Sequence, residues 1–395
     1  MKSAPFKVLT LSDRQTAYIK SLCDDNTTPF LMFNPERVRE QYLALKSALP
    51  SVRLFYAMKP CPLGEVIQVL ASEGASFDVA TIGEIKLAIA NGVDPSNLIH
   101  THPIKRDVDI RGALGFGVNV FVVDNPAEIR KFVEYKDDVR LLLRVSFRSP
   151  NAKIDLSKKF GCHPDKVSAN LELAKELGIT VFGLSFHVGS QTTDPKQYVV
   201  AIEKCNEIVR EGKKKGFELN VIDIGGGFPI CYGDSEKIVP KISEFTKPIN
   251  EALSLLPSNV SVYAEPGRFI CAPSMTSVAR VMGKAERDGK YCYYLDDGIY
   301  GSYSGIIWDY CHYPRAFIRG MNSDEVQDCT VGDYKQTILY GPTCDSIDTI
   351  GEDVDMEELE IGDLVVGFNM GAYSWVTATD FNFWDRTSIV SCDFE

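Results

Sequence analysis

Short apolar runs alternate with segments of helical periodicity along most of the chain, and this alternation limits the possible folds more than any other feature. Eight runs have the length and apolar content of strands: Leu54–Met58, Phe77–Ala80, Leu98–His102, Val120–Val123, Arg140–Val145, Phe182–His187, Val221–Ile224 and Val262–Ala264. Helix-period segments lie between them: Glu65–Glu73, Ile82–Asn91, Pro126–Tyr135, Ala169–Leu177, Tyr198–Lys214 and Ile242–Leu256. Eight units favour a TIM-type (β/α)8 barrel, an α/β fold, over a doubly wound sheet, which usually has fewer repeats.

The segments on either side of this repeat predict a second domain. Pro29–Phe33 has a strand pattern, and Asn34-Pro35 supplies a cap and a first-turn proline for a helix that runs to about Ala48. After Arg268, short strands alternate with Gly, Asp and Pro turns: Tyr291–Leu295, Gln336–Leu339, Leu364–Phe368 and Thr387–Ser391. We therefore expect a barrel with its leading helix over residues 29–268 and a C-terminal all-β domain over 269–395, joined by residues 1–28.

Composition narrows the class of protein and its partners. The 395 residues are 45% hydrophobic and 24% charged, as in ordinary globular proteins, and the N-terminus lacks the apolar core of a signal peptide. No apolar run approaches the roughly 20 residues that span a bilayer. The eleven cysteines include no Cys-x-x-Cys pair, which indicates reduced thiols and a cytoplasmic location. A net charge of -12 disfavours nucleic acid and anionic membranes and would attract cationic small molecules.

Residues suited to catalysis and binding gather where the predicted strands end. They are Lys59, Asp78, Arg144, His187, Gly225–Gly227, Glu265 and Arg268. Active sites of TIM barrels lie at the C-terminal face, where these strand ends would meet. Random placement would scatter such residues over both faces of the barrel.

These residue types together would hold pyridoxal phosphate. Lys59 offers an amine, the glycines offer bare N–H groups for a phosphate, and Glu265 would keep a pyridine nitrogen protonated. Arg268 would meet the phosphate, and the imidazole of His187 could lie against the ring. Each feature also has a simpler interpretation, because lysines are mostly solvated, glycine runs make tight turns, and Glu/Arg pairs occur on surfaces. His100 and His102 have no spaced Cys or carboxylate partner, so we expect no metal site.

Eight segments, in order, resemble the eukaryotic-type ornithine decarboxylase family, the barrel-fold, alanine-racemase-like decarboxylases of basic amino acids. They are Phe55-Tyr-Ala-Met-Lys59, Phe77-Asp-Val-Ala, Ser185-Phe-His-Val-Gly-Ser190, Asp223-Ile-Gly-Gly-Gly-Phe-Pro229, Ala264-Glu-Pro-Gly-Arg268, Asp296-Asp-Gly-Ile-Tyr-Gly-Ser302, Gly341-Pro-Thr-Cys-Asp345 and Asn369-Met-Gly-Ala-Tyr373. The resemblance covers nearly the whole chain. It implies a pyridoxal 5'-phosphate-dependent carboxy-lyase that converts L-ornithine to putrescine and CO2 in polyamine biosynthesis.

The resemblance also implies a role for each site residue. Lys59 would bind the cofactor covalently, His187 would stack on its ring, and Glu265 would pair with the pyridine nitrogen. The phosphate would be held by Ser190, Gly227, Arg268 and Tyr373, and Gly225, Gly226 and Gly267 would also bind the cofactor. Asp78, Glu84 and Arg144 would support the lysine and the ring.

By the same resemblance the enzyme would be a homodimer whose active sites lie at the subunit interface. Cys344 would protonate the carbanion, and Asp345 and Asp309 would receive the distal ammonium of the substrate, all in a pocket lined by Tyr300 and Phe381. Cys344 and Asp345 would then serve the cofactor of the other subunit. A buried cysteine without a catalytic role is the simpler interpretation of Cys344.

Departures from the family pattern leave the substrate open. Met58, Pro60-Cys61-Pro62 and Trp308-Asp309-Tyr310 replace more usual residues, and Trp308 adds bulk beside Asp309. Lysine, or both lysine and ornithine, would fit, because the two substrates differ by one methylene worth only about 1–3 kcal/mol. Asp345 disfavours meso-diaminopimelate and intact Asp309 disfavours arginine. A catalytically inactive regulator resembling the antizyme inhibitors is disfavoured by Lys59, and a barrel racemase by Cys344-Asp345.

Overall fold

The computed structural model describes residues 6–147, 159–232, 239–321 and 335–393. The chain forms two compact units. The barrel unit comprises Arg39–Ile230 and Ile238–Ile270, and the sheet unit comprises Met1–Val38, Cys231–Lys237 and Cys271–Glu395.

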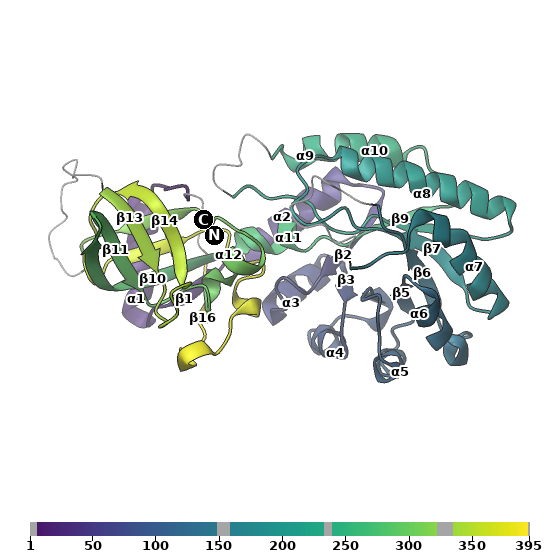
Figure 1. Cartoon of the computed structure of the whole chain (residues 1–395), viewed down its shortest axis with the longest axis horizontal. Coiled ribbons are helices and arrows are strands. Elements are labelled where there is room, and N and C mark those ends of the chain that lie inside the picture. The colour runs from purple at the N-terminus through teal and green to yellow at the C-terminus, as the bar shows by residue number, and fades with distance from the viewer. Residues whose placement is uncertain (1–5, 148–158, 233–238, 322–334, 394–395) are drawn as a thin grey trace. The chain divides into compact units, whose positions relative to one another are not determined.

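The barrel unit is built on eight parallel strands that close in sequence order (Figure 1). They are β2 (Val52–Ala57), β3 (Ser76–Val79), β4 (Leu98–His100), β5 (Val120–Val123), β6 (Arg140–Arg144), β7 (Val181–Ser185), β8 (Val221–Asp223) and β9 (Ser261–Ala264). β9 pairs with β2 to complete the ring. The predicted TIM-type barrel is therefore confirmed.

Helices cover the outside of this ring, as the separate α3 to α8 in Figure 1 show. The helices that lie wholly in the barrel unit are α3 (Gly64–Ser72), α4 (Ile82–Ala90), α5 (Asp107–Gly115), α6 (Pro126–Lys131), α7 (Val167–Glu176), α8 (Lys196–Lys214), α9 (Ile242–Phe245) and α10 (Lys247–Leu253). α2 (Pro35–Ala48) and α11 (Arg268–Cys271) each have residues in both units. Thr81 and Asn125 accept hydrogen bonds from the N–H groups of Glu84 and Glu128, and so cap α4 and α6. The caps fix where these helices begin after their strands.

Apolar side chains fill the barrel. One buried cluster joins residues from β2, β4, β5, β6 and β8: Phe55, Ile99, Val120, Val122, Leu142 and Val221. Strands such as Val120–Val123 are buried along their whole length, which is why they occur in the sequence as continuous apolar runs. Filling the interior in this way leaves the strand ends as the places where polar side chains can act.

The sheet unit is mainly β-structure, as predicted for the C-terminal region. Its strands run in the order β12 (Arg315–Ile318), β15 (Leu364–Gly367), β10 (Met275–Arg287), β11 (Lys290–Leu295), β13 (Lys335–Tyr340) and β14 (Thr349–Met356). β1 (Phe30–Phe33) joins it by pairing antiparallel with β10 and parallel with β16 (Ser388–Ser391). Helices α1 (Asp13–Asp25) and α12 (Gly305–Trp308) complete the unit.

The N-terminal segment is part of the sheet unit's core. Ile19 of α1 is buried with Phe30 and Met32 of β1 against Val278 of β10. Figure 1 shows the purple N-terminal helix among the green and yellow strands of the C-terminal region. Residues 29–38, which the sequence groups with the barrel, cluster with the sheet; the expected domain division otherwise stays a prediction.

The structure departs from the sequence-based elements in a few places. The predicted helix Ile242–Leu256 is two helices, α9 and α10, because Pro248 lacks the N–H that a continuous helix needs and begins a new first turn instead. The strands β10, β12 and β14 and the helices α1 and α5 were not predicted. Among the described residues, none of the helices combines the length and the apolar character that crossing a bilayer requires.

Candidate active site

The carboxyl end of the barrel brings together the polar residues that the sequence places at strand ends. Lys59 follows β2, Asp78 lies in β3, and Arg144 is the last residue of β6. The loops after β7, β8 and β9 carry His187 with Ser190, the glycines 225–227, and Glu265. All of them therefore stand at one end of the parallel ring, as predicted.

Lys59 and Asp78 form an ion pair. The Nζ atom of Lys59 lies 3.1 Å from Oδ2 of Asp78, whose side chain is buried while that of Lys59 remains 45% exposed. The N–H of Met58 donates to the carbonyl oxygen of Asp78 at 3.2 Å, which holds the end of β2 beside β3. Glu84 accepts from the N–H of Ala80 at 2.5 Å, and burial raises the pKa of its carboxyl group. The amine thus projects from a fixed strand end toward accessible space.

Glu265 lies in a crowd of buried carboxylates. Burial is the main cause that raises the pKa of Glu265 well above its ordinary value, and the negative charges of Asp223 and Asp78 raise it further. Burial also raises the pKa of Asp223 to about 6, although its Oδ1 accepts a hydrogen bond from the N–H of Gly225 at 2.8 Å. A cationic group placed here would stabilise the ionised form of Glu265.

The imidazole of His187 is held neutral. Burial lowers its pKa well below the ordinary value, and the positive charges of Arg144 and Lys59 act in the same direction. Its Nδ1 accepts a hydrogen bond from the N–H of Gly189 at 3.0 Å, so the ring proton belongs on Nε2. A neutral, fixed ring suits stacking against a flat aromatic ligand.

The glycines after β8 can have no side chains. Gly225 and Gly227 have φ angles of 67° and 109°, and a Cβ atom on Gly226 would lie 2.5 Å from the carbonyl oxygen of Glu265 and 3.3 Å from Nε2 of His187. Bare backbone therefore passes directly beside the imidazole and the glutamate. This is the close approach that backbone N–H groups need to bind an anion.

Arg268 and Ser190 supply side-chain donors nearby. Nη2 of Arg268 donates to Oγ of Ser190 at 3.1 Å, and Arg268 is only 5% exposed. At Gly267, a Cβ atom would lie 2.7 Å from Cγ of Pro60, so this turn too requires glycine. A guanidinium, a hydroxyl and bare backbone form a donor set that suits a phosphate.

Comparison with known proteins identifies the family. Residues 35–272 match the family model described as pyridoxal-dependent decarboxylase, pyridoxal binding domain. A lysine/ornithine decarboxylase of Selenomonas ruminantium is 34% identical over 377 residues, covering 95% of this chain and 92% of that protein. The chain belongs to the pyridoxal phosphate-dependent basic amino acid decarboxylases.

Two solved structures of family members are similar over nearly the whole chain. Both are of lysine/ornithine decarboxylase from Vibrio vulnificus, one complexed with putrescine and one with cadaverine. Both are 49% identical to this chain, and both are aligned over their full length. The alignments cover 98% of this chain with a TM-score of 0.89 for the putrescine complex, and 97% with a TM-score of 0.90 for the cadaverine complex. The chain is thus a carboxy-lyase of this family that acts on a basic amino acid with pyridoxal 5'-phosphate.

The barrel residues fit this cofactor. The clearest observation is the glycine run, whose missing side chains leave backbone beside His187 and Glu265 where Cβ atoms would collide. An accessible amine, a neutral imidazole and a buried carboxyl group stand at the same barrel end. These groups match the aldehyde, the ring face and the ring nitrogen of pyridoxal phosphate in chemical type.

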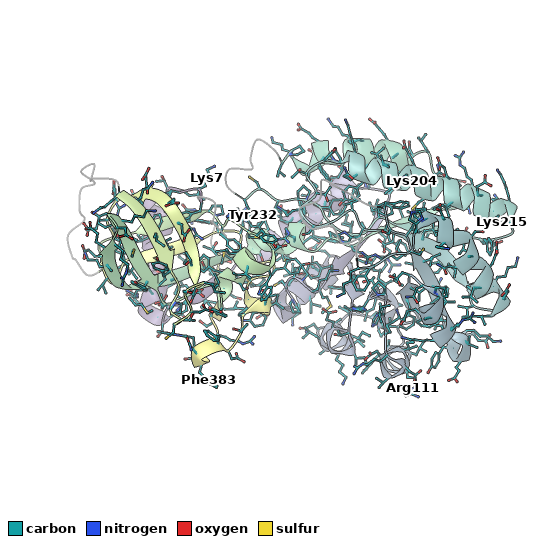
Figure 2. All side chains as sticks on the ribbon, in the orientation of Figure 1. Lys7, Arg111, Lys204, Lys215, Tyr232 and Phe383 are labelled. Atoms are coloured by element: carbon teal, nitrogen blue, oxygen red, sulfur yellow. The ribbon has the colours of Figure 1, made fainter. Side chains whose placement is uncertain are left out.

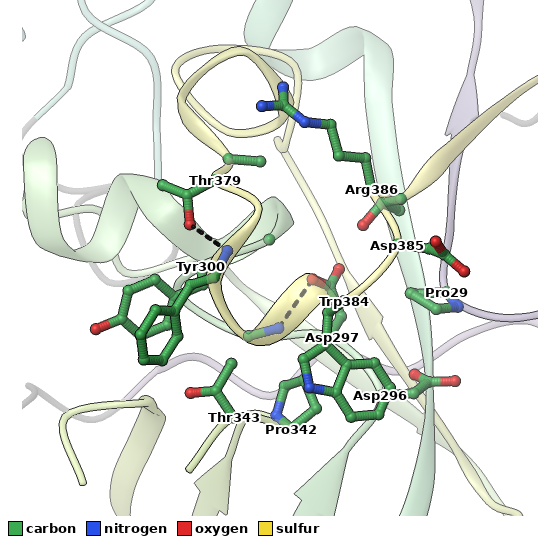
Figure 3. A pocket seen from close by; sticks show the side chains of 15 residues that line it. Pro29, Asp296, Asp297, Tyr300, Pro342, Thr343, Thr379, Trp384, Asp385 and Arg386 are labelled. Carbon is green, nitrogen blue, oxygen red and sulfur yellow. Dashed lines mark hydrogen bonds between the residues drawn. The ribbon is translucent and has the colours of Figure 1, made fainter. Parts of the chain in front are cut away.

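The remaining predicted site residues lie in the sheet unit, and three of them are in contact. The hydroxyl of Tyr300 donates to Oδ2 of Asp345 at 2.5 Å, and its ring stacks on that of Phe381 with 4.5 Å between centroids. The hydrogen bond to Asp345 raises the pKa of Tyr300 to about 12 and lowers that of Asp345. Figure 3 shows Tyr300 near Thr343 and Pro342 in a pocket of this unit, which Phe381 also lines.

The other three residues of the sheet unit have separate surroundings. Cys344 is exposed, and its N–H donates to Oδ1 of Asn382 at 3.1 Å. Asp309 is buried, and the thiol of Cys311 donates to its Oδ2 at 3.3 Å. Tyr373 is half-buried with a φ angle of 53°. Phe383, which directly follows Asn382, is 94% exposed and points away from the ribbon in Figure 2.

Three residues of the barrel end were not singled out from the sequence. Asp223 belongs to the glycine motif and could have been found there, and Thr101 follows β4, at the same edge as Lys59. Tyr198 of α8 donates from its hydroxyl to the carbonyl oxygen of Gly226 at 2.9 Å, which fixes the glycine run from outside. No local pattern in the sequence indicates that long-range bond. Among the described residues, His, Cys, Asp and Glu form no cluster of three that could hold a metal.

Proposed function

We propose that the enzyme converts L-ornithine to putrescine and CO2, and that L-lysine, giving cadaverine, is a second substrate. The observation that carries the proposal is the 49% identity to the Vibrio vulnificus lysine/ornithine decarboxylase, whose structures contain putrescine in one case and cadaverine in the other. The net charge of -12 also favours a cationic substrate. The reaction would take place in the cytoplasm, as the reduced cysteines suggest.

Lys59 is the residue proposed to bind the cofactor covalently. Its amine stands at the end of β2, is 45% exposed, and is oriented by the ion pair with Asp78. Glu84 would support this pair from the start of α4, where the N–H of Ala80 holds its carboxyl group. The amine can thus leave its partner, react, and return to the same position when product is released.

The proposed ring site consists of Glu265, Arg144 and His187. Pyridoxal phosphate, when bound, accepts the electron pair that is released as the bond between Cα and the carboxylate breaks. Glu265 would hold a proton on the ring nitrogen, and that cationic nitrogen would offset the burial that raises the pKa of Glu265. His187 would lie against the ring, and Arg144, at the end of β6, would balance the nearby carboxylates.

The proposed phosphate site uses donors from three loops. Ser190 and Arg268 would offer a hydroxyl and a guanidinium, which already contact each other. The bare backbone of Gly225, Gly226, Gly227 and Gly267 would offer N–H groups. Tyr373 of the sheet unit would add a phenol hydroxyl.

The sheet unit is proposed to supply the substrate-binding and proton-donating residues. Asp345 and Asp309 would receive the distal ammonium, in a pocket lined by Tyr300 and Phe381, and the Cys344 thiol would deliver the proton to Cα after CO2 leaves. We further propose a homodimer in which these residues serve the partner's cofactor. The exposure of Cys344 and of the aromatic side chain of Phe381 supports a contact with another subunit.

Steady-state kinetics with four amino acids tests the proposed substrate. L-ornithine should have the highest kcat/KM, L-lysine should follow within about two orders of magnitude, and L-arginine and meso-diaminopimelate should be much poorer. Asp345→Ala should reduce kcat/KM for L-ornithine roughly 30-fold or more while sparing an uncharged analogue such as norvaline. A preference for L-arginine or meso-diaminopimelate would contradict the proposal.

A further inference from the structure

Thr101 lies directly after β4 at the carboxyl end of the barrel, next to the Lys59–Asp78 pair. Its side chain is buried, with only 9% of the residue exposed. Its N–H donates to the carbonyl oxygen of Val79 at 3.0 Å, and its hydroxyl donates to Oδ1 of Asp78. Both its backbone and its side chain are therefore tied to β3.

The two oxygens of Asp78 have different donors. Oδ1 accepts from Thr101, and Oδ2 accepts from Lys59 Nζ at 3.1 Å. Asp78 is only 3% exposed, so water has little access to it. A carboxylate that accepts on both oxygens cannot turn about its χ2 angle without breaking one of these bonds.

We propose that Thr101 is a positioning residue, which fixes the carboxylate of Asp78 and through it the amine of Lys59. The inference rests on the proposed role of Lys59 in binding the cofactor. Removal of the hydroxyl would leave a buried carboxylate oxygen without its donor, which is costly. Asp78 would then rotate or take up water, and its hold on Lys59 would loosen.

Threonine suits this role better than other hydroxyl residues. Its branched Cβ restricts χ1, and the backbone bond to Val79 fixes where the side chain starts. Valine has nearly the same shape without the donor, whereas serine keeps the donor with more freedom. The two substitutions therefore separate hydrogen bonding from packing.

Competitive acylation of the full-length enzyme, freed of cofactor, tests the proposal. The reactivity of Lys59 is measured by peptide mass spectrometry relative to Lys204 and Lys215, whose exposed side chains project from and just beyond α8 (Figure 2). An ammonium held by a carboxylate reacts slowly, so Thr101→Val should raise the relative rate at Lys59 about three- to tenfold, and Thr101→Ser should stay within about twofold of wild type. Visible absorbance should show that Thr101→Val binds added pyridoxal phosphate covalently more slowly than wild type, whereas Thr101→Ser binds it at the wild-type rate.

Thr246→Val is the matched control. It also removes a buried hydroxyl, one that donates to the carbonyl oxygen of Ile242 at 2.9 Å, and it should leave Lys59 reactivity unchanged. Thr101→Ala is a second variant without the hydroxyl, in case valine prevents folding. Wild-type Lys59 reactivity in a folded Thr101→Val or Thr101→Ala protein would overturn the proposal, as would failure of both to fold. If Lys59 does not bind the cofactor, Thr101→Val should still raise the acylation rate of Lys59 but should not change the rate of cofactor uptake. Failure of the proposed role of Lys59 can thus be told apart from failure of the proposed role of Thr101.

Discussion

At the scale of single residues, burial governs the charges at the barrel end. Burial raises the pKa of Glu265, lowers that of His187, and raises that of Asp223 to about 6. The same residue types on a surface would carry their ordinary charges at neutral pH. A cofactor with a cationic ring nitrogen and an anionic phosphate would complement this environment, and its binding would be coupled to the protonation of Glu265.

Replacement of Arg268 tests the proposed phosphate site. Arg268→Ala should raise the dissociation constant of pyridoxal phosphate about tenfold or more, because a hydrogen bond to a charged group is lost, and it should change kcat much less at saturating cofactor. Equilibrium titration by absorbance or fluorescence measures the affinity. Arg111→Ala is the control, since Arg111 lies on α5 (Figure 2) and forms an ion pair with the exposed Asp107. Equal affinity in Arg268→Ala and wild type would contradict the assignment.

His100 should make the protein sensitive to acid. Burial lowers its pKa from 6.5 to about 4, and neither ring nitrogen has a hydrogen-bond partner among the described residues. Below about pH 6.5 the His100 ring takes up a proton in the unfolded state, whereas in the folded state it does so only below about pH 4. The free energy of unfolding therefore has its full value above about pH 6.5 and falls as the pH drops from 6.5 to 4. The His100→Phe variant keeps an aromatic ring beside Phe121 but cannot take up a proton. Between about pH 7 and pH 5 its free energy of unfolding, measured in urea, should fall by about 2 kcal/mol less than that of wild type. Parallel pH profiles of the two proteins would contradict this assignment.

At the scale of elements, the barrel could be predicted and the sheet unit only in outline. Val120–Val123 was predicted with its observed bounds, because parallel strands buried on both faces are continuous apolar runs. β10 was missed, since its second half is exposed and carries Lys284 and Glu286 among its apolar residues. Its pairing with β1 joins distant parts of the sequence, which local periodicity does not report.

Much of the barrel site could be predicted because functional residues of a TIM barrel lie where its strands end, and the strands themselves could be predicted. A residue such as Lys59 is conspicuous at the end of an apolar run, and the parallel topology brings such ends together. Thr101 stands at an equivalent place but was missed, because threonine is common in strands and its type indicates no chemistry. Contacts from outside the strand ends, such as Tyr198 to Gly226, depend on how α8 packs.

Gly226→Ala should disturb the turn after β8. The added Cβ would lie 2.5 Å from the carbonyl oxygen of Glu265, so the loop must shift. We expect a loss of about 1–3 kcal/mol in the free energy of unfolding and weaker binding of pyridoxal phosphate. Thermal unfolding and cofactor titration measure the two effects. Gly115→Ala in α5, where a Cβ meets nothing within 4 Å, should be neutral or stabilising; the same result for Gly226→Ala would count against a close approach.

At the scale of the whole molecule, the proposed chemistry is divided between two units. The amine, the ring site and most of the phosphate site belong to the barrel unit, whereas Cys344, Asp345 and Asp309 belong to the sheet unit. Such a division allows one subunit's barrel to work with another subunit's sheet residues. It also gives the proposed dimer a direct genetic test.

Subunit mixing tests whether the sites are shared. Lys59→Ala and Cys344→Ala, each inactive, should regain activity when equal amounts are mixed and allowed to exchange. About half of the dimers would be mixed, each with one intact and one doubly damaged site, so recovery should approach about a quarter of wild-type activity. A tag on each variant demonstrates exchange by co-purification. Exchange without recovery would mean that both residues serve the same chain's site.

The role of Lys59 in decarboxylation is measured by the release of labelled CO2 from carboxyl-labelled L-ornithine by Lys59→Ala. The purified wild-type enzyme with pyridoxal phosphate should release it with each turnover, and Lys204→Ala, which changes an exposed lysine of α8, should match wild type. Lys59→Ala should remain folded by circular dichroism and lose at least about 1,000-fold in kcat, because the covalent attachment and its positioned amine are gone. Turnover at the wild-type rate by folded Lys59→Ala would contradict a covalent role for Lys59 in decarboxylation.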